Sequence, residues 1–330
     1  MSSLSIITGF LGSGKTTLLN RLLQREDMAR TAVLINELGE IGIDNLIVEQ
    51  FDDDVVLLES GCVCCSVRDD LSASLLDLHT RSQRGVIPEF DRAVLETTGI
   101  ADPAAILQLL MADRDVCERY RYSTVITVVD ALYGPDNLQR LPEVSRQVLM
   151  ADRLVLAKQD LVDTAATLAL QEKLAQLNPL APCFDNDTVT PAELFATDVA
   201  NDVRVPAAAT DHGHRFTTFH LGWQQAVDWA AIEAWAEGLL AARGDDIYRI
   251  KGILNLKGEP RPAVFQSVQH SVYAREYLEA WPTGSPRNDL VFIVQHFTKP
   301  AALASLEPFV HVPLVQPTDA GAPCADTHVE

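Results

Sequence analysis

The sequence predicts an α/β fold with a mostly parallel sheet, followed by a smaller C-terminal α+β domain. In the first half, short apolar runs rich in β-branched residues alternate with helix-like segments. This alternation is typical of strands that are buried on both faces and joined by helices. Near residue 185 a loop-rich stretch begins, and beyond it several strand-like runs accompany only two helical segments. A chain of 330 residues is long enough for two such cores.

The elements of the first half follow one another in a regular order. Apolar runs predict strands at 4–8, 31–36, 55–59, 92–96, 123–130 and 153–157. The intervening segments predict helices at 15–25, 68–83, 102–112, 143–150 and 163–177, with a short helix at 191–196. A strand, a helix and a second strand in succession favour right-handed crossovers between parallel strands.

In the second half, strand-like runs outnumber helical segments. Strand-like runs lie at 216–221, 247–256, 262–273 and 290–297, and helices are expected at 224–242 and from residue 300 onward. We therefore divide the chain into a first domain at 1–205, a linker at 206–214 and a C-terminal domain at 215–330. The tail of the last domain, after about residue 315, is expected to be flexible.

Composition and charge limit the class of protein. Hydrophobic residues make up 47% of the chain and charged residues 22%, the balance of a globular protein. No apolar run approaches the roughly 20 residues that span a bilayer, and the N-terminus has no basic segment typical of a signal peptide. We therefore expect a cytoplasmic protein with no membrane partner. A net charge of −20 repels nucleic acid and excludes it as a general partner. The same charge suits attraction to metal cations, although solubility is the favoured explanation.

The stretch "GFLGSGKTT" fits the phosphate-loop pattern G-x-x-x-x-G-K-[ST]. It follows a predicted strand and begins a predicted helix, which is the context in which backbone N–H groups cradle phosphates. Lys15 is expected to reach the β- and γ-phosphates, and the Thr16 hydroxyl to bind Mg²⁺. The loop therefore predicts a nucleoside triphosphate site. Its predicted binding residues are Gly9, Gly12, Ser13, Gly14, Lys15, Thr16 and Thr17.

The stretch "AKQD" follows the sixth predicted strand and resembles the N-K-x-D pattern of many GTPases. Lys158 and Asp160 fit that pattern, whereas Ala157 stands where asparagine is common. A carboxylate here can accept two hydrogen bonds from the N1 and N2 groups of guanine, a donor pair that adenine lacks. GTP is therefore favoured over ATP.

The fourth predicted strand ends in "ETTG". In phosphate-loop proteins this place is usually taken by D-x-x-G, with an acidic group near Mg²⁺ and a glycine N–H on the γ-phosphate. Glu96 and Gly99 are expected to play these two parts.

Taken together, these stretches resemble the CobW-type family of P-loop GTPases, relatives of UreG and HypB. The resemblance rests on "GFLGSGKTT", "INELGEIGID", "ESGCVCCSVRDDL", "ETTGIADP", "ADRLVLAKQDL" and "LNPLAP", and it extends to "RIKGILNL" and "VFQSVQHSVY". It implies slow, metal-modulated GTP hydrolysis that is coupled to the handling of zinc, cobalt or another transition metal. It also implies a client metalloprotein and a possible homodimer.

Three of the six cysteines lie in "GCVCC", between a predicted strand and a predicted helix. Such a loop emerges at the carboxyl edge of a parallel sheet, the edge that also carries the phosphate loop. Cys62, Cys64 and Cys65 together would form a soft site suited to Zn²⁺, Cu(I) or Co²⁺. A redox pair and thiols buried for packing are the alternatives. The family resemblance assigns this C-x-C-C to metal binding.

The loop "NELGEIGID" at 36–44 reaches the same edge and is rich in carboxylates. We expect Glu37 to complete the transition-metal shell and Asp44 to act in catalysis or beside Mg²⁺; a solvated polar loop is the alternative. His212 and His214 favour a solvated linker over a metal site. The predicted catalytic residues are then Lys15, Asp44 and Glu96.

The expected mechanism is a metal-dependent switch. Mg²⁺–GTP orders the loop at 36–44 beside the three thiols, and hydrolysis loosens the loop and releases the metal to a client. Two alternatives stay open: a phosphate-loop ATPase or kinase with incidental cysteines, and a sensor that binds metal and GTP with negligible turnover. Arg249 and Lys251 have no assigned role, because a ligand contact and ordinary surface charge explain them equally well.

Overall fold

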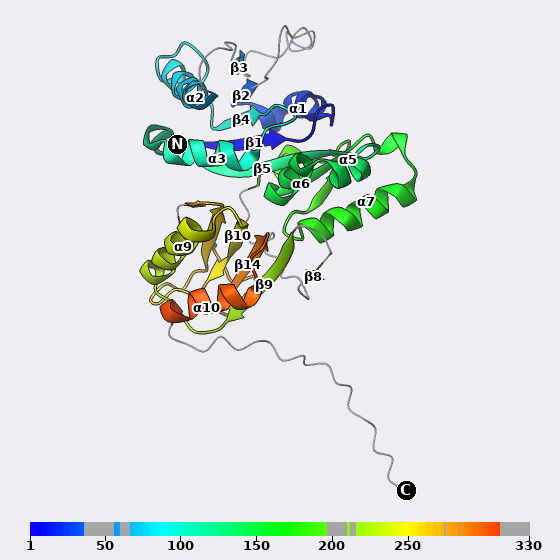
Figure 1. Cartoon of the computed structure of the whole chain (residues 1–330). Helices are drawn as coiled ribbons and strands as arrows, with labels where there is room; N and C mark the ends of the chain where they lie inside the picture. The colour runs from blue at the N-terminus through cyan, green and yellow to red at the C-terminus, as the bar shows by residue number, and fades with distance from the viewer. Residues whose placement is uncertain are drawn as a thin grey trace.

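The computed structural model describes residues 1–35, 56–59, 67–196, 210–211 and 216–310 except 274 and 283, with 56–59, 67–70 and 210–211 as backbone only. Figure 1 shows two sheets, with the second, in yellow to orange, below the strands and helices of the first. The predicted fold class is confirmed: a parallel sheet flanked by helices is followed by an antiparallel sheet with helices.

The first sheet has the strand order β3-β2-β4-β1-β5-β6-β7, and all of its neighbouring strands are parallel. Its strands are β1 (Ser2–Thr8), β2 (Thr31–Ile35), β3 (Val56–Glu59), β4 (Arg92–Glu96), β5 (Tyr120–Asp130), β6 (Arg153–Ala157) and β7 (Cys183–Asp185). Its helices are α1 (Lys15–Leu23), α2 (Val67–Gln83), α3 (Pro103–Ala112), α4 (Arg114–Arg119), α5 (Gly134–Arg140), α6 (Pro142–Met150), α7 (Thr164–Leu177) and α8 (Pro191–Phe195), with 3-10 turns η1 (Glu26–Met28) and η3 (Gln159–Leu161).

Helices cover both faces of this sheet, which explains why its strands read as continuous apolar runs. Leu4 and Ile6 of β1 pack in a cluster with side chains of α2 and α3. Ile7, the next residue along, packs in a separate cluster with side chains of α1. Because successive side chains of a strand point to opposite faces, the central strand is buried on both sides.

The second sheet is antiparallel, in the order β12-β11-β10-β14-β9-β8, with β13 paired to β11. Its strands are β8 (Thr210–Asp211), β9 (Thr217–Trp223), β10 (Ile247–Leu254), β11 (Ala263–Val268), β12 (Ser271–Val272), β13 (Glu276–Tyr277) and β14 (Asn288–Val294). The helices α9 (Trp229–Arg243) and α10 (Lys299–Val310) cover one face, where Trp235 packs beside Phe265 and Phe292.

The structure adds elements that the sequence did not predict and shortens one that it did. The short elements β7, α4 and α5 were not predicted, because each offers too few residues for a periodic pattern. Helix α9 begins at Trp229 rather than at residue 224, because the backbone of Val227 bonds to that of Asn255 and Lys257 and so stays extended. Within the predicted linker, the two residues of β8 pair with β9.

Among the described residues, no helix combines the length and the apolar character that crossing a bilayer requires.

The face of the second sheet that α9 and α10 leave uncovered packs against the first domain. Tyr248, Val291 and Ile293 form one buried cluster with Leu149 at the end of α6 and Leu180 after α7. Along β14 these side chains alternate with residues that face α9 and α10, as the period of two requires. On β10 the alternation is interrupted by a register shift between Ile247 and Arg249.

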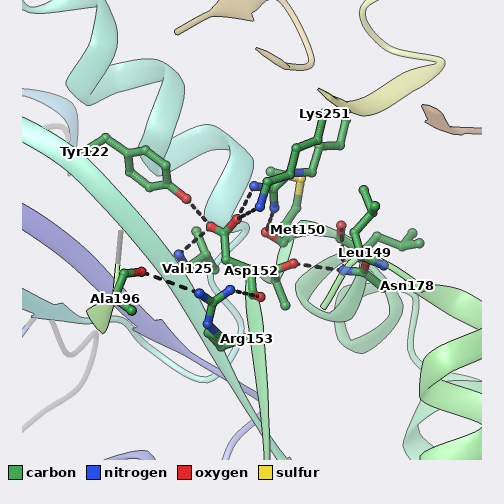
Figure 2. A network of polar contacts seen from close by, with 12 residues as sticks. Tyr122, Val125, Leu149, Met150, Asp152, Arg153, Asn178, Ala196 and Lys251 are labelled. Carbon is green, nitrogen blue, oxygen red and sulfur yellow. Dashed lines mark hydrogen bonds and ion pairs between the residues drawn. The ribbon is translucent and has the colours of Figure 1, made fainter. Parts of the chain in front are cut away.

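A buried carboxylate, Asp152, lies at the centre of this contact, between α6 and β6. It accepts hydrogen bonds from the Arg249 guanidinium, from Lys251 Nζ at 3.3 Å, from the Tyr122 hydroxyl at 2.5 Å and from the backbone N–H of Val125 at 2.9 Å. Figure 2 shows Tyr122, Val125 and Lys251 converging on this carboxylate. Arg249 and Lys251 are each only 2% exposed, so neither belongs to the surface charge that the sequence suggested as one alternative.

The surroundings keep Asp152 ionised. Burial alone raises the pKa of this carboxyl, but the charges of Arg249 and Lys251 outweigh burial and hold the pKa below its usual range. Burial lowers the pKa of Arg249, and the charge of Asp152 more than restores it. Burial and the neighbouring carboxylate both raise the pKa of Tyr122, which stays neutral. The two domains therefore share a buried carboxylate with two cations.

We expect Asp152→Ala to lower the free energy of unfolding by about 3–5 kcal/mol, because it leaves two buried cations without their carboxylate. Urea unfolding, followed by tryptophan fluorescence, measures the change. Asp91→Ala is the matched control, since Asp91 pairs with Arg30 where both side chains are at least half exposed, and its removal should change stability little. Equal losses in the two variants would contradict the assignment.

The pH dependence of the same pair has a defined sign. Because the pKa of Asp152 in the fold lies below the unfolded value of about 3.9, its contribution is complete above that pH and is lost as the pH falls through the folded pKa. The stability difference between wild type and Asp152→Asn should stay constant from about pH 8 to 5 and shrink only below about pH 4. A difference that already shrinks between pH 8 and 6 would argue against this reading.

Candidate nucleotide site

The phosphate loop connects the central strand β1 to α1. Strand β1 lies between β4 and β5, where the strand order reverses and where open parallel sheets bind ligands beyond the carboxyl ends of their strands. Gly9 and Gly14 have φ values of 143° and 100°, a region that favours glycine. A Cβ on Gly9 would lie 2.3 Å from the Val128 carbonyl oxygen of β5. The loop therefore depends on glycine for both its turn and its packing.

The positive groups of the loop are arranged to receive an anion. The N-terminal amides of α1 have no side-chain cap, and an uncapped helix N-terminus attracts phosphate. The Lys15 ammonium is buried and donates to the carbonyl oxygens of Gly9 at 3.0 Å and Phe10 at 3.3 Å. Ser13 is also buried, whereas Thr17 is exposed on α1. The spacing predicted from sequence thus produces a cradle of the right chemistry.

Thr16 and Glu96 meet below this cradle. The Thr16 hydroxyl donates to Glu96 Oε1 at 2.6 Å, although 80 residues separate the two in sequence. Glu96 is the last residue of β4 and is buried. A hydroxyl and a buried carboxylate side by side form a hard oxygen donor set, which fits Mg²⁺. These two residues could therefore hold the metal ion that accompanies a nucleotide.

Gly99 packs directly against the phosphate loop. A Cβ at this position would lie 2.5 Å from both the backbone nitrogen and the Cα of Leu11. Thr97, two residues before Gly99, is anchored to β1, because its N–H donates to the Ile7 carbonyl and its hydroxyl donates to Thr8. The glycine predicted to sense the γ-phosphate is thus adjacent to the loop that would hold it.

Lys158 connects three strand ends of this edge. The backbone of Lys158 has a φ of 60°. Its side-chain ammonium donates to the carbonyl oxygen of Gly12 and to Asp130 Oδ2, both at 2.7 Å. Asp130 Oδ1 accepts the N–H groups of Leu132 and Tyr133 and shapes the turn after β5. Asp130 was not among the predicted site residues, although an acidic residue that ends a buried strand at this edge was a usable signal.

Asp160 lies in η3, where it is exposed to solvent. The neighbouring loop after β7 lies close, because the N–H of Asn186 donates to the Leu156 carbonyl of β6. An exposed carboxylate at this place could receive the donor pair of a guanine base.

The remaining predicted site residues lie outside the described part of the chain. This holds for the carboxylates Glu37 and Asp44 and for the thiols Cys62, Cys64 and Cys65. His212 and His214 of the expected linker also lie outside it. The elements on both sides of the thiols are described: β3 ends at Glu59 and α2 begins at Val67. Within the described residues, no group of three histidine, cysteine or acidic side chains forms a metal site.

Comparison with known families agrees with this geometry. Residues 3–185 match the nucleotide-binding domain of the CobW/HypB/UreG family, and residues 216–310 match the C-terminal domain of the cobalamin synthesis protein CobW. The chain belongs to this family. The matched ranges include the phosphate loop, Glu96 and Lys158 and cover both sheets apart from β8 and Ser2.

Individual relatives resemble nearly the whole chain. The zinc chaperone YjiA of Escherichia coli K12 is 33% identical over 304 residues, covering 88% of this chain and 93% of the relative. The zinc-regulated GTPase metalloprotein activator 1 of Schizosaccharomyces pombe is 27% identical, covering 84% and 76%. The crystal structure of Zn(II)-bound YjiA GTPase from E. coli has a TM-score of 0.68 at 28% identity, covering 93% of this chain and 98% of that one.

We expect Lys158→Met to weaken GDP binding by about tenfold to a hundredfold, because the loss of two charge-assisted hydrogen bonds frees the phosphate loop from the turn after β5. Titration of a fluorescent GDP analogue measures the affinity. Lys299→Met, which removes an ammonium at the start of α10, is the control and should bind GDP like wild type. Unchanged GDP affinity in Lys158→Met would show that the two hydrogen bonds of Lys158 have no part in nucleotide binding.

Proposed function

We propose that this protein is a GTP-dependent metallochaperone that binds zinc through its C-x-C-C segment and delivers it to a client metalloprotein. The chain is a GTPase of the CobW/YjiA family. The observation that carries the proposal is the topology of the first sheet. β3 runs parallel to β1 in that sheet, so the segment that follows β3 leaves from the edge that carries the phosphate loop.

The GTPase part of the proposal assigns roles to the residues at that edge. Lys15 and the Gly99 N–H contact the γ-phosphate, Thr16 and Glu96 hold Mg²⁺, and Asp44 orients the attacking water. The water oxygen forms a bond to the γ-phosphorus as the bond to the GDP oxygen breaks, and the proton of the water passes to the released phosphate. The contact between Thr16 and Glu96 supports this assignment.

Zinc is the cargo of the protein. Cys62, Cys64, Cys65 and Glu37 supply the ligands, and three thiolates with one carboxylate suit Zn²⁺ or Co²⁺ better than Mg²⁺. The names of the relatives, a zinc chaperone and a zinc-regulated metalloprotein activator, support zinc over cobalt and support a metalloprotein client. The protein works in the cytoplasm, and pairing of two copies across the nucleotide edge is compatible with this role.

Asp160→Asn tests the base. An asparagine amide cannot accept both donors of guanine, but it can accept the N1–H of xanthine and donate to the 2-oxo group. We therefore expect GTP affinity to fall about a hundredfold or more and xanthosine triphosphate to bind more tightly than GTP. Competition against a fluorescent GDP analogue measures both affinities. Wild-type preference for ATP, with no gain for xanthosine triphosphate in the variant, would instead support a phosphate-loop ATPase or kinase.

Metal titration tests the coupling between the two sites. The reduced protein is titrated with Zn²⁺, and with Co²⁺ as a spectroscopic probe, in its apo, Mg²⁺–GDP and Mg²⁺–GTP states. We expect thiolate-to-cobalt absorption and the tightest Zn²⁺ binding in the GTP state, because γ-phosphate contacts order the loop that carries Glu37.

The double variant Cys64→Ala, Cys65→Ala is the control for the thiols, and Cys117→Ala is the matched control for a cysteine outside the segment. Cys117 lies at the end of the first domain away from the phosphate loop, on α4. Metal binding that ignores both the nucleotide and the two thiols would exclude the chaperone. Normal metal and GTP binding with negligible turnover in single-turnover assays would point to a sensor.

A further inference from the structure

A buried glutamine, Gln147 of α6, holds the turn that contains Gly99. Its side chain is fully buried, and Nε2 donates to the carbonyl oxygens of Gly99 at 3.2 Å and Ala101 at 3.1 Å. Within the turn itself, the Ala101 N–H donates to the Thr98 carbonyl oxygen at 3.1 Å. The Gln147 amide therefore bonds to two of the four residues of this turn, which runs from Thr98 to Ala101.

The turn follows Thr97, which is bonded to β1 and whose hydroxyl also lies 3.2 Å from the Thr98 carbonyl oxygen. The most apolar side chain of the turn, Ile100, is 62% exposed and so contributes little burial. On the other side, the backbone of Gly99 contacts Leu11 of the phosphate loop so closely that no side chain fits between them. The Gly99 backbone thus lies between Gln147 on one side and the phosphate loop on the other.

Gln147 itself is fixed by the surrounding structure. Its own carbonyl accepts a hydrogen bond from the Thr127 hydroxyl of β5 at 2.8 Å. A small pocket is lined by Gln147 together with Ser13 and Leu11 of the phosphate loop. Gln147 therefore lies near both β5 and the phosphate loop.

Helix α6 also carries the contact with the second domain. The Arg249 guanidinium donates to the carbonyl oxygen of Met150 at 2.8 Å, three residues beyond Gln147. Asn178 donates to the carbonyl oxygens of Val148, Leu149 and Ala151, and Figure 2 shows its amide beside Leu149. The end of α6 is thus held independently of the turn.

We propose that Gln147 is a positioning residue for GTP hydrolysis, which holds the Gly99 turn where its N–H meets the γ-phosphate. The proposal rests on the nucleotide site proposed above. Because GDP has no γ-phosphate, the hydrogen bonds from Gln147 to the turn contribute to the binding of GTP and of the transition state but not to the binding of GDP. Its removal should therefore lower kcat and leave GDP affinity nearly unchanged.

Two substitutions separate this role from simple support of the core. Gln147→Leu keeps a side chain of similar size but removes both donors. Gln147→Glu keeps the shape and places a carboxylate against the carbonyl oxygens of Gly99 and Ala101. When protonated, that carboxyl regains one donor. Asn178→Leu is the matched control, because Asn178 is an equally buried amide that grips α6 but does not touch the turn.

The experiment measures single-turnover GTP hydrolysis, affinities for GDP and for a slowly hydrolysed GTP analogue, and urea unfolding for each variant. We expect Gln147→Leu to lower kcat about tenfold and to weaken binding of the GTP analogue more than that of GDP. Asn178→Leu should lose stability but keep wild-type kcat. The kcat of Gln147→Glu, relative to wild type, should rise as the pH falls.

A loss of kcat in Gln147→Leu no larger than in Asn178→Leu, or an equal loss of GDP and GTP-analogue affinity, would overturn the proposal. If Gln147→Leu does not fold, the pH profile of Gln147→Glu decides, and a profile parallel to that of wild type is the contrary outcome. Failure of the wild-type protein to hydrolyse GTP would instead refute the proposed function, so the two failures are distinguishable.

Discussion

The common direction of the strands in the first sheet is the constraint on which the rest of the structure depends. Because all neighbouring strands are parallel, their carboxyl ends meet at one edge. Thr16, Glu96 and Lys158 are thereby brought to one place although they are far apart in sequence. Each connection must also cross back over the sheet, which supplies the helices that bury both faces.

The opposite, amino-terminal end of the sheet carries the contact with the second domain. Asp152 precedes β6 and Lys158 follows it, so a single buried strand separates the interdomain pair from the nucleotide edge. Helix α6 likewise contacts both sites, since Gln147 bonds to the Gly99 turn and Met150 accepts a hydrogen bond from Arg249. Elements shared between two sites are the physical condition for coupling between them.

The parts of the structure that follow local rules were predictable from sequence. The phosphate loop was recognised because glycine, lysine and threonine must stand at set intervals for a chain to wrap a phosphate, and the apolar runs were recognised because both faces of the sheet are covered. The parts that depend on long-range contacts were not predictable. Asp130 matters only because Lys158 reaches it, and Gln147 matters only because α6 places its amide against Gly99. Arg249 had no assignable role until its partner Asp152, 97 residues earlier, was known.

That separation of 97 residues has a consequence for how the protein is made. During synthesis the first domain leaves the ribosome with Asp152 and the apolar side chains of Leu149 and Leu180 facing water, well before β10 and β14 exist to cover them. The carboxylate can reach its full burial only once Arg249 and Lys251 have been synthesised. A chain that stops before β10 keeps an apolar patch beside an uncovered charge, and such a fragment is prone to aggregate. The second domain thus completes the surface of the first as well as folding on its own sheet.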